Sequence, residues 1–106
     1  MQVQINAPHG EFPDTLIELI EREIEERLAK HASRLTRVEV HLQDLNAHKG
    51  GIDKRCLLEA RPRGMDPVAA DHESAQVADA FKGALDKLHR ILDRRFGKLS
   101  SRGHGA

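Results

Sequence analysis

Residues 76–99, QVADAFKGALDKLHRILDRRFGKL, form the stretch around which the rest of the chain is arranged. Apolar side chains recur in this stretch at steps of three and four: Val77, Phe81, Leu85, Leu88, Leu92, Phe96 and Leu99. This spacing places them on one face of a helix with 3.6 residues per turn. We therefore expect a long amphipathic helix over residues 76–99 whose apolar face is buried against the rest of the chain.

The remaining positions of this stretch carry mostly positive charge. Basic side chains also follow steps of three and four, with two more nearby: Lys87, Arg90, Arg94 and Lys98, then Lys82 and Arg95. Residues 82–106 contain seven Lys or Arg and only two Asp. Such a helix can pack with one side and contact a polyanion with the other. The alternative is a solvated charged face that serves only solubility.

Length and composition describe an ordinary small folded protein. A chain of 106 residues fits one domain with one core. The single cysteine, Cys56, excludes an internal disulfide and suits a reducing compartment. No apolar run approaches the roughly 20 residues of a membrane span, and the first residues lack the pattern of a signal peptide. We expect one domain over residues 1–99, a flexible tail over residues 100–106, a cytoplasmic location and no membrane partner.

The formal net charge is zero, but the charge changes along the chain. Residues 1–33 hold seven acidic and three basic side chains, whereas residues 34–70 and residues 71–106 each hold seven basic and five acidic ones. The zero net charge argues against an indiscriminate nucleic-acid binder. The charge is polarised between an acidic first third and a basic remainder.

Alternation of polar and apolar residues predicts strands at residues 2–6, 37–43 and 54–61, and Val68, Ala70 and His72 indicate a further strand. Pro13 and Asp14 suit the first turn of a helix that should extend to about residue 32. Its inward positions are Leu16, Leu19 or Ile20, Ile24, Leu28 and His31. Residues 44–53 and 62–67 are predicted connections, and residues 71–74 should lead into the long helix, with Ser74 as its cap.

The predicted order is strand, helix, strand, strand, strand, helix. Because each helix has one apolar stripe and each strand one apolar face, the economical fold has two layers. We expect an α+β fold, a two-layer β-α-β-β-β-α arrangement, with a four-stranded sheet and two helices packed on one face. The last three strands should form an antiparallel meander, and the other sheet face should be open to solvent.

The sequence predicts no catalytic or metal site. The seven histidines fall in different elements, and none has a familiar ligand spacing to another His or to Cys56. Cys56 shares its predicted face with Leu58 and Ala60, where cysteine behaves as a small apolar residue. The carboxylates of the first helix form an exposed ladder that has no means of shifting its pKa values. We expect no enzymatic activity, no cofactor and no metal.

The remaining candidates are the cations. Besides the helical row, they lie around the second and third predicted strands: Lys49, Lys54, Arg55, Arg61 and Arg63. Phosphate contacts need positive charges in a fixed geometry, which a long helix supplies. Binding through such a set should depend on salt and on shape more than on base sequence. Phe12, Phe81 and Phe96 are the only aromatic residues, so stacking on single-stranded bases is not expected.

The chain resembles the short, single-domain form of the ribosome hibernation-promoting factor and ribosome-associated inhibitor family. The resemblance extends from residue 1 to about residue 99 and is carried by several segments: Met1-Gln2-Val3-Gln4-Ile5, Leu35 to Leu42, Asp53-Lys54-Arg55-Cys56 with Glu59-Ala60-Arg61, and Ala84 to Leu88 followed by Arg90, Leu92, Arg94 and Arg95. It implies the same two-layer fold. Lys87, Arg90, Arg94 and Arg95 match basic positions of the family's second helix, and Arg37 and Lys54 match basic strand positions.

The resemblance also implies a partner and a function. Members bind ribosomal RNA of the small ribosomal subunit near the decoding channel, where they block messenger and transfer RNA and keep idle ribosomes inactive and protected, as in a stress response. The present chain departs from many members in its acidic first helix, in its zero net charge, and in having Val77 or Ala78 where an aromatic residue is common. We also expect no second domain after Leu99, unlike in members that pair ribosomes through their own dimerisation. We expect the protein to be a monomer or a weak homodimer. The alternative function is a non-catalytic protein-interaction or self-associating module, in which the acidic first helix of one copy meets the basic second helix of another.

Overall fold

The computed structural model describes residues 1–7, 12–45 and 54–103, with only the backbone described for residues 98–103. The elements occur in the order β1 (Gln2–Asn6), α1 (Asp14–Arg27), the 3-10 helix η1 (Ala29–Arg34), β2 (Leu35–Asp44), β3 (Lys54–Pro62), β4 (Val68–Ser74) and α2 (Val77–Gly103). This confirms the predicted α+β order of strands and helices. The predicted connection at residues 46–53, which contains Lys49, lies outside the described residues.

The four strands form one sheet in the order β1-β2-β3-β4. β1 is parallel to β2, with Val3 opposite Val38, while β2, β3 and β4 form the predicted antiparallel meander, with Val40 opposite Leu58. A parallel pair requires a crossover connection, which α1 and η1 provide. As a result β1 and β4 are the two edges of the sheet.

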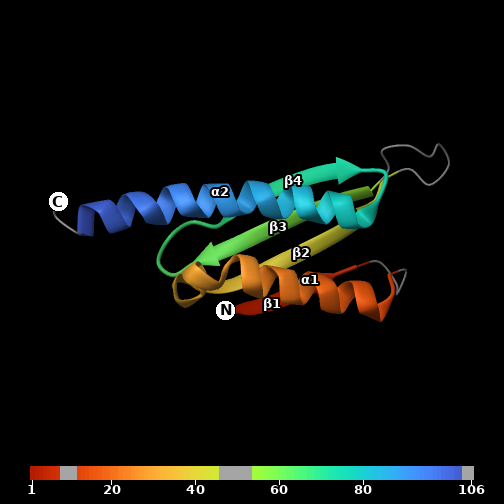
Figure 1. Ribbon diagram of the computed structural model, residues 1–106, viewed down its shortest axis with the longest axis horizontal. Coiled ribbons are helices and arrows are strands. Elements are labelled where there is room, and N and C mark those ends of the chain that lie inside the picture. The colour runs from red at the N-terminus through yellow and green to blue at the C-terminus, as the bar shows by residue number, and fades with distance from the viewer. Residues whose placement is uncertain (8–11, 46–53, 104–106) are drawn as a thin grey trace.

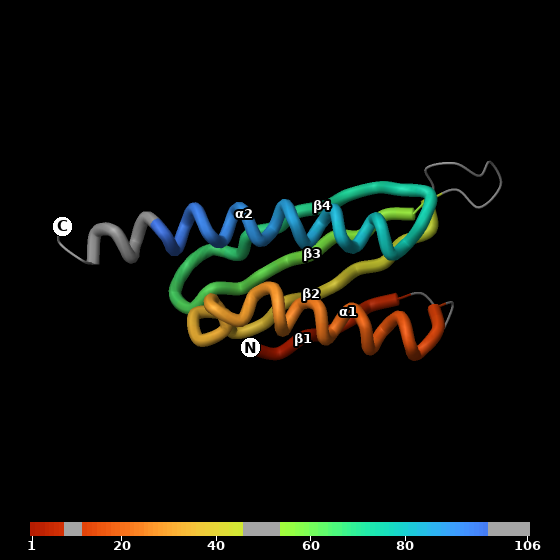
Figure 2. The backbone as a smooth tube through the Cα atoms, in the orientation of Figure 1, coloured from red at the N-terminus to blue at the C-terminus, as the bar shows by residue number. Residues whose placement is uncertain are grey.

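Both helices cover the same face of the sheet, and Figures 1 and 2 show them side by side in front of the strands. The core lies between these layers, where Val40 and Leu58 of the sheet face the helices together with Cys56. Five residues of the predicted apolar stripe of α2 are buried: Phe81, Leu85, Leu88, Leu92 and Phe96. Val77 is half-buried against the core, and the side chain of Leu99 lies outside the described residues.

The first helix is shorter than predicted, because α geometry ends at Arg27 instead of near residue 32. Leu28 has φ −104° and ψ 14°, and the His31 amide then bonds to the Leu28 carbonyl three residues back, which is the 3-10 pattern. Leu28 and His31 are nevertheless buried, as predicted. The start of α1 also differs, since the amides of Leu16 and Ile17 bond to the Pro13 carbonyl and the N-cap has no side-chain bond.

β4 is longer than predicted. The sequence predicts that residues 71–74 lead into the long helix, but they belong to the strand, where His72 lies opposite Cys56 and Ser74 opposite Lys54. Ser74 accepts a hydrogen bond from the Gln76 amide at 3.5 Å, just before α2 begins. α2 extends to Gly103 instead of ending at residue 99. The polar side chains at the end of β4 do not show the alternation that predicts a strand. The backbone pairing with β3 nevertheless holds this segment in the sheet.

α2 approaches β4 closely at Gly83. A Cβ atom added there would collide with the ring of His72, so this position admits only glycine unless the ring moves. The His72 ring packs closely on Gly83. Figures 1 and 2 show α2 lying along β4. The side chains on the outer side of α2 are therefore held beside the edge of the sheet.

Candidate nucleic-acid interface

Three of the predicted binding residues lie together on the side of α2 that borders β4. Lys87, Arg90 and Arg94, which we call the basic flank, line a surface groove of about 340 Å³. The groove is completed by Ile91 of α2 and, from β4, by Ala69, Ala70 and Asp71. All three cations are exposed. Because Leu88 and Leu92 of the same helix are fully buried, the cations are displayed by a backbone that is anchored in the core.

The charges of the basic flank are largely free of internal partners. Lys87 donates a hydrogen bond from Nζ to the backbone carbonyl of Asp71 at 2.9 Å, which leaves its positive charge unneutralised. Within the described part of the chain, Arg90 and Arg94 have neither an ion pair nor a side-chain hydrogen bond. An incoming anion would therefore meet two guanidinium groups that have no acidic partner to give up.

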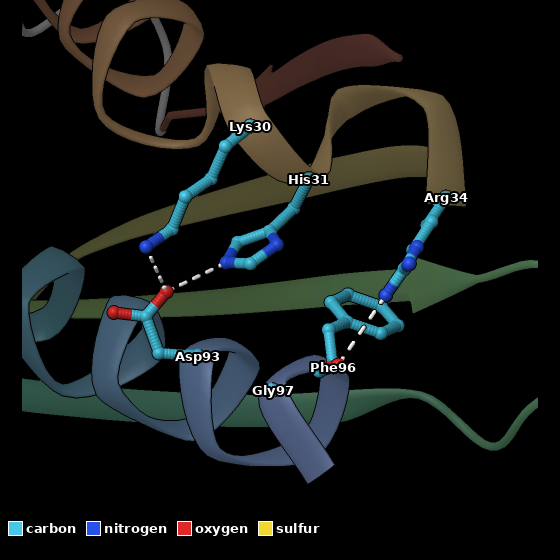
Figure 3. A pocket seen from close by; sticks show the side chains of 6 residues that line it. All are labelled: Lys30, His31, Arg34, Asp93, Phe96 and Gly97. Carbon is cyan, nitrogen blue, oxygen red and sulfur yellow. Dashed lines mark hydrogen bonds and ion pairs between the residues drawn. The ribbon is translucent and has the colours of Figure 1, made fainter. Parts of the chain in front are cut away.

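The other flank of α2, which faces α1 and η1, is neutralised. Asp86 pairs with Arg27 at 2.9 Å, and Asp93 pairs with both Lys30 at 2.9 Å and His31 at 2.7 Å. Figure 3 shows the carboxylate of Asp93 between the side chains of Lys30 and His31. Asp86 and Asp93 thus bind cations of the preceding elements, and among the described residues neither carboxylate pairs with the basic flank.

Asp93 occupies a cleft of about 420 Å³ between η1 and α2. Hydrogen bonds from Lys30 and then from His31 lower the pKa of Asp93 to about 2. Since an ionised carboxylate only accepts hydrogen bonds, the Nε2 atom of the buried His31 is the donor. The His31 ring also packs on the Phe96 ring, and the guanidinium carbon of Arg34 lies over the same ring, 5.2 Å from its centre. These contacts fasten η1 to α2.

The predicted strand cations are paired with acidic neighbours. Arg55 donates from Nε to Asp71 at 3.0 Å, and Lys54 lies 3.1 Å from Asp44. Arg37 lies 3.6 Å from Glu39, whose carboxylate also accepts a hydrogen bond from Arg61 at 3.2 Å. Arg37, Arg55 and Arg61 therefore belong to a nearly balanced charge ladder on the open face of the sheet.

The Glu39 carboxylate is the centre of that ladder. Desolvation raises its pKa, but the hydrogen bond from Arg61 and the charge of Arg37 outweigh this effect, so the pKa of Glu39 lies below its ordinary value. Glu59 contributes a second carboxylate, 2.7 Å from Arg61. An anion that approached this face would have to displace existing carboxylates, which the basic flank does not require.

The other predicted cations are distributed differently. Lys82 is exposed, but it lies five residues before Lys87, which is about 140° around an α-helix. Arg95 is half-buried, and the side chain of Lys98 lies outside the described residues. Arg63 donates from Nε to the Ser33 carbonyl at 3.2 Å. Among the described residues, the structure therefore brings together Lys87, Arg90 and Arg94 and places the other predicted cations elsewhere.

The sequence did not indicate that β4 contributes to this surface. Ala69, Ala70 and Asp71 line the groove, although none of them has a side chain that signals binding. The available signal was the chain order, because a strand–helix–strand unit can pair its two strands in parallel, which places β1 beside β2 and leaves β4 as an edge next to the following helix. Strand order together with the helical positions of Lys87, Arg90 and Arg94 would have identified the groove.

The described residues also bear on three other possibilities: a metal site, a reactive thiol and a membrane-spanning helix. They contain no group of three or more His, Cys, Asp or Glu side chains that could hold a metal ion. Cys56 is buried as predicted, and burial raises the pKa of its thiol to about 12. No helix in the described part of the chain is both long and apolar enough to cross a membrane.

Fold and surface together define a small two-layer α+β domain with a row of exposed cations on its second helix. Residues 3–100 match the family model for the sigma 54 modulation protein / S30EA ribosomal protein family. The chain belongs to this family, which confirms the resemblance to hibernation-promoting factors seen in the sequence. A comparison with curated proteins gave no match.

Two solved structures share this fold. A ribosomal subunit interface protein from Coxiella burnetii has a TM-score of 0.70 and 16% sequence identity, with 92% of this chain and 99% of that chain covered. The Protein Y N-terminal domain from Thermus thermophilus has a TM-score of 0.69 and 20% identity, with 89% of this chain and 98% of that domain covered. At these identities the likeness concerns the fold, and it confirms the predicted architecture.

Proposed function

We propose that this protein is a ribosome-associated hibernation factor that regulates translation. It binds ribosomal RNA of the small subunit near the decoding channel, and its folded body blocks the path of messenger and transfer RNA. Membership of the S30EA ribosomal protein family supports this proposal, as does the fold shared with a ribosomal subunit interface protein. The expected location is the cytoplasm, where ribosomes work.

The observation that carries the proposal is the basic flank. Lys87, Arg90 and Arg94 are exposed on one helix, and the two arginines have no acidic partner among the described residues. Residues four apart on a helix are about 6 Å apart along its axis, so the spacing of Arg90 and Arg94 is fixed by the backbone. Fixed cations can contact successive phosphates with little further ordering of the protein.

The proposed mechanism is steric and needs no catalytic group. Phe81 and Phe96 are buried and Phe12 is half-buried, so contacts to phosphate and sugar should dominate over base stacking. Binding should therefore follow the shape of the RNA more than its sequence. Once the basic flank holds the RNA backbone, the two-layer body occupies space that messenger and transfer RNA would need.

Co-sedimentation of the purified protein with small subunits and whole ribosomes tests the proposal. The wild type should pellet with them at low salt and progressively less at high salt. The triple variant Lys87→Glu, Arg90→Glu, Arg94→Glu should fail to pellet although it stays folded. Arg22→Glu is the matched control for Arg90→Glu, because Arg22 is also an exposed arginine on a helix and the charge change is the same.

Absence of co-sedimentation at every salt concentration would contradict the proposal. Equal loss of binding in Arg22→Glu and Arg90→Glu would also contradict it, since only net charge would then matter. Light scattering tests the alternative function, in which the acidic α1 of one copy meets the basic α2 of another. A salt-sensitive dimer that does not bind ribosomes would favour that self-associating module over the hibernation factor.

A further inference from the structure

The outer edge of β4 lies beside the basic flank and is available to another strand. β4 is the last strand in the order β1-β2-β3-β4, so β3 occupies only one of its two sides. In the described part of the chain no strand pairs with the other side. An edge of this kind presents backbone amides and carbonyls that can bind an extended segment.

The contact between Lys87 and Asp71 identifies the backbone groups that face this edge. Lys87 reaches the Asp71 carbonyl from the α2 side, so this carbonyl points away from β3. In an antiparallel ladder the groups that face one side recur at every second residue. The amides and carbonyls of Ala69, Asp71 and Glu73 therefore face the free edge together.

The groove beside this edge has an apolar floor and a basic rim. Ala69, Ala70 and Ile91 supply the apolar part, and the three residues of the basic flank supply the charge. Lys87 now covers the Asp71 carbonyl, but it is an exposed, flexible side chain and can move aside. An amide of an added strand would take its place on the carbonyl, and the ammonium group would become free for a carboxylate.

We propose that this groove docks an extended acidic peptide segment, which joins the sheet as an additional strand beside β4. Arg90 and Arg94 are about 6 Å apart along the helix axis. Alternate residues of a strand are about 6.6 Å apart. Acidic side chains at every second position of the added strand therefore match the two arginines, while the peptide backbone bonds to Ala69, Asp71 and Glu73.

The charge and the backbone pattern select this occupant over two others. A second copy that paired through its own β4 would bring its own Lys87, Arg90 and Arg94 close to the first set, and like charges would oppose the contact. RNA could contact the same cations, but it has no ladder of amides and carbonyls to match the edge. Peptide and RNA would use the same arginines, so each should exclude the other.

Amide hydrogen exchange with the full chain and a synthetic peptide of alternating glutamate and valine tests the docking site. Peptide binding should slow the exchange of the amides of Ala69, Asp71 and Glu73. A peptide of the same sequence with N-methyl groups at alternate residues should bind about ten-fold more weakly, because it loses one row of backbone hydrogen bonds. Equal binding of the two peptides, or no slowing of exchange, would overturn the proposal.

Two protein variants separate the contribution of the β4 backbone to peptide binding from that of the basic flank. Ala69→Pro removes an edge amide that does not bond to β3, so it should weaken the peptide about ten-fold while circular dichroism stays unchanged. Arg90→Glu should weaken the peptide, and Arg22→Glu should not. If Ala69→Pro fails to fold, the comparison of the N-methylated and unmethylated peptides on the wild-type protein still tests the docking site. Binding of RNA but not of peptide would overturn the docking site and leave the proposed function standing.

Discussion

Asp93 is the residue through which the charges of α2 are sorted. Its carboxylate lies 2.7 Å from Nε2 of His31 and 2.9 Å from Nζ of Lys30, and Nδ1 of His89 is 3.5 Å from its other oxygen. The Asp93 carboxylate thus lies close to three basic side chains, those of Lys30, His31 and His89. Arg90 and Arg94, on the opposite side, receive none from the described residues.

Replacement of Asp93 by Asn should lower the stability of the fold, most of all near neutral pH. The pKa of Asp93 is lowered from 3.8 to about 2 by Lys30 and His31, so on acidification the unfolded state takes up the proton first. The stabilisation is therefore complete above about pH 4 and is lost as the pH falls through about 2. Because the side chain is one third exposed, we expect about 1 kcal/mol. Urea unfolding of both proteins at several pH values measures it.

Asp86→Asn is the matched control for this variant. Asp86 is also an α2 aspartate paired across to the preceding helix, but it and Arg27 are 50% and 39% exposed. An exposed ion pair contributes little, so its loss should change the unfolding free energy by less than about 0.5 kcal/mol. If the two variants lost equal stability at neutral pH, or if Asp93→Asn kept the acid dependence of the wild type, the role given to Asp93 would be wrong.

At the scale of single residues, the sequence predicted which side chains are buried but not which charged side chains form ion pairs. The inward positions Ile24, Leu28 and Cys56 follow from spacing alone, and all three are fully buried. The ion pair between Arg55 and Asp71 joins residues of two strands and depends on their register, which spacing within one strand does not contain. For this reason the predicted set of cations contained several whose charge is already balanced.

At the scale of elements, the long helix was the most predictable part. Its apolar stripe repeats over seven positions, and tertiary contacts have little freedom to override a signal of that length. η1 was missed because Leu28 and His31 continue the inward spacing of α1, so an α-helix and a 3-10 turn predict the same buried residues. The end of β4 was missed because its polar side chains resemble a helix start, whereas the ladder with β3 decides the structure.

The two glycines of α2 should respond in opposite ways to substitution by alanine. A Cβ at Gly97 would meet no atom within 4 Å, so Gly97→Ala should stabilise the protein by up to about 1 kcal/mol through helix propensity. A Cβ at Gly83 would collide with the His72 ring, so Gly83→Ala should lose that gain and become destabilising. Thermal unfolding of the two variants measures this difference.

The double variant Gly83→Ala, His72→Ala serves as the control for this prediction. Removal of the ring should relieve the collision, so the alanine at position 83 should then cost less than it does in the wild-type background. Equal stabilisation by alanine at positions 83 and 97 in the wild type would show that α2 does not depend on close packing against His72.

At the scale of the whole molecule, charge is distributed by element. α1 carries exposed glutamates, including Glu18, Glu21 and Glu25, the open sheet face balances its own charges, and the basic flank lies at the edge formed by α2 and β4. A protein with zero net charge can therefore present a positive surface along the edge formed by α2 and β4. The sequence indicated the polarity along the chain, but strand order and helix orientation were needed to convert it into a surface.

Under the proposed function, this distribution determines how ribosome binding depends on salt. If each of the three cations contacts one phosphate, the logarithm of the binding constant should fall with the logarithm of salt concentration with a slope of about −2 to −3. Arg90→Gln should reduce the magnitude of this slope by about 1 and weaken binding to all RNA sequences alike. Arg55→Gln should change it less, because Arg55 must first give up its bond to Asp71.

Binding of labelled protein to small subunits across a salt series measures these slopes. Arg22→Gln is the control, since it removes one exposed arginine from the acidic α1 and should leave the slope unchanged. If Arg55→Gln lowered the slope as much as Arg90→Gln, the open sheet face would be in contact with RNA and its charge ladder would have to open on binding. If no variant changed the slope, phosphate contacts by the basic flank would be excluded, because counterion release counts the cations that reach the RNA wherever they lie on the protein.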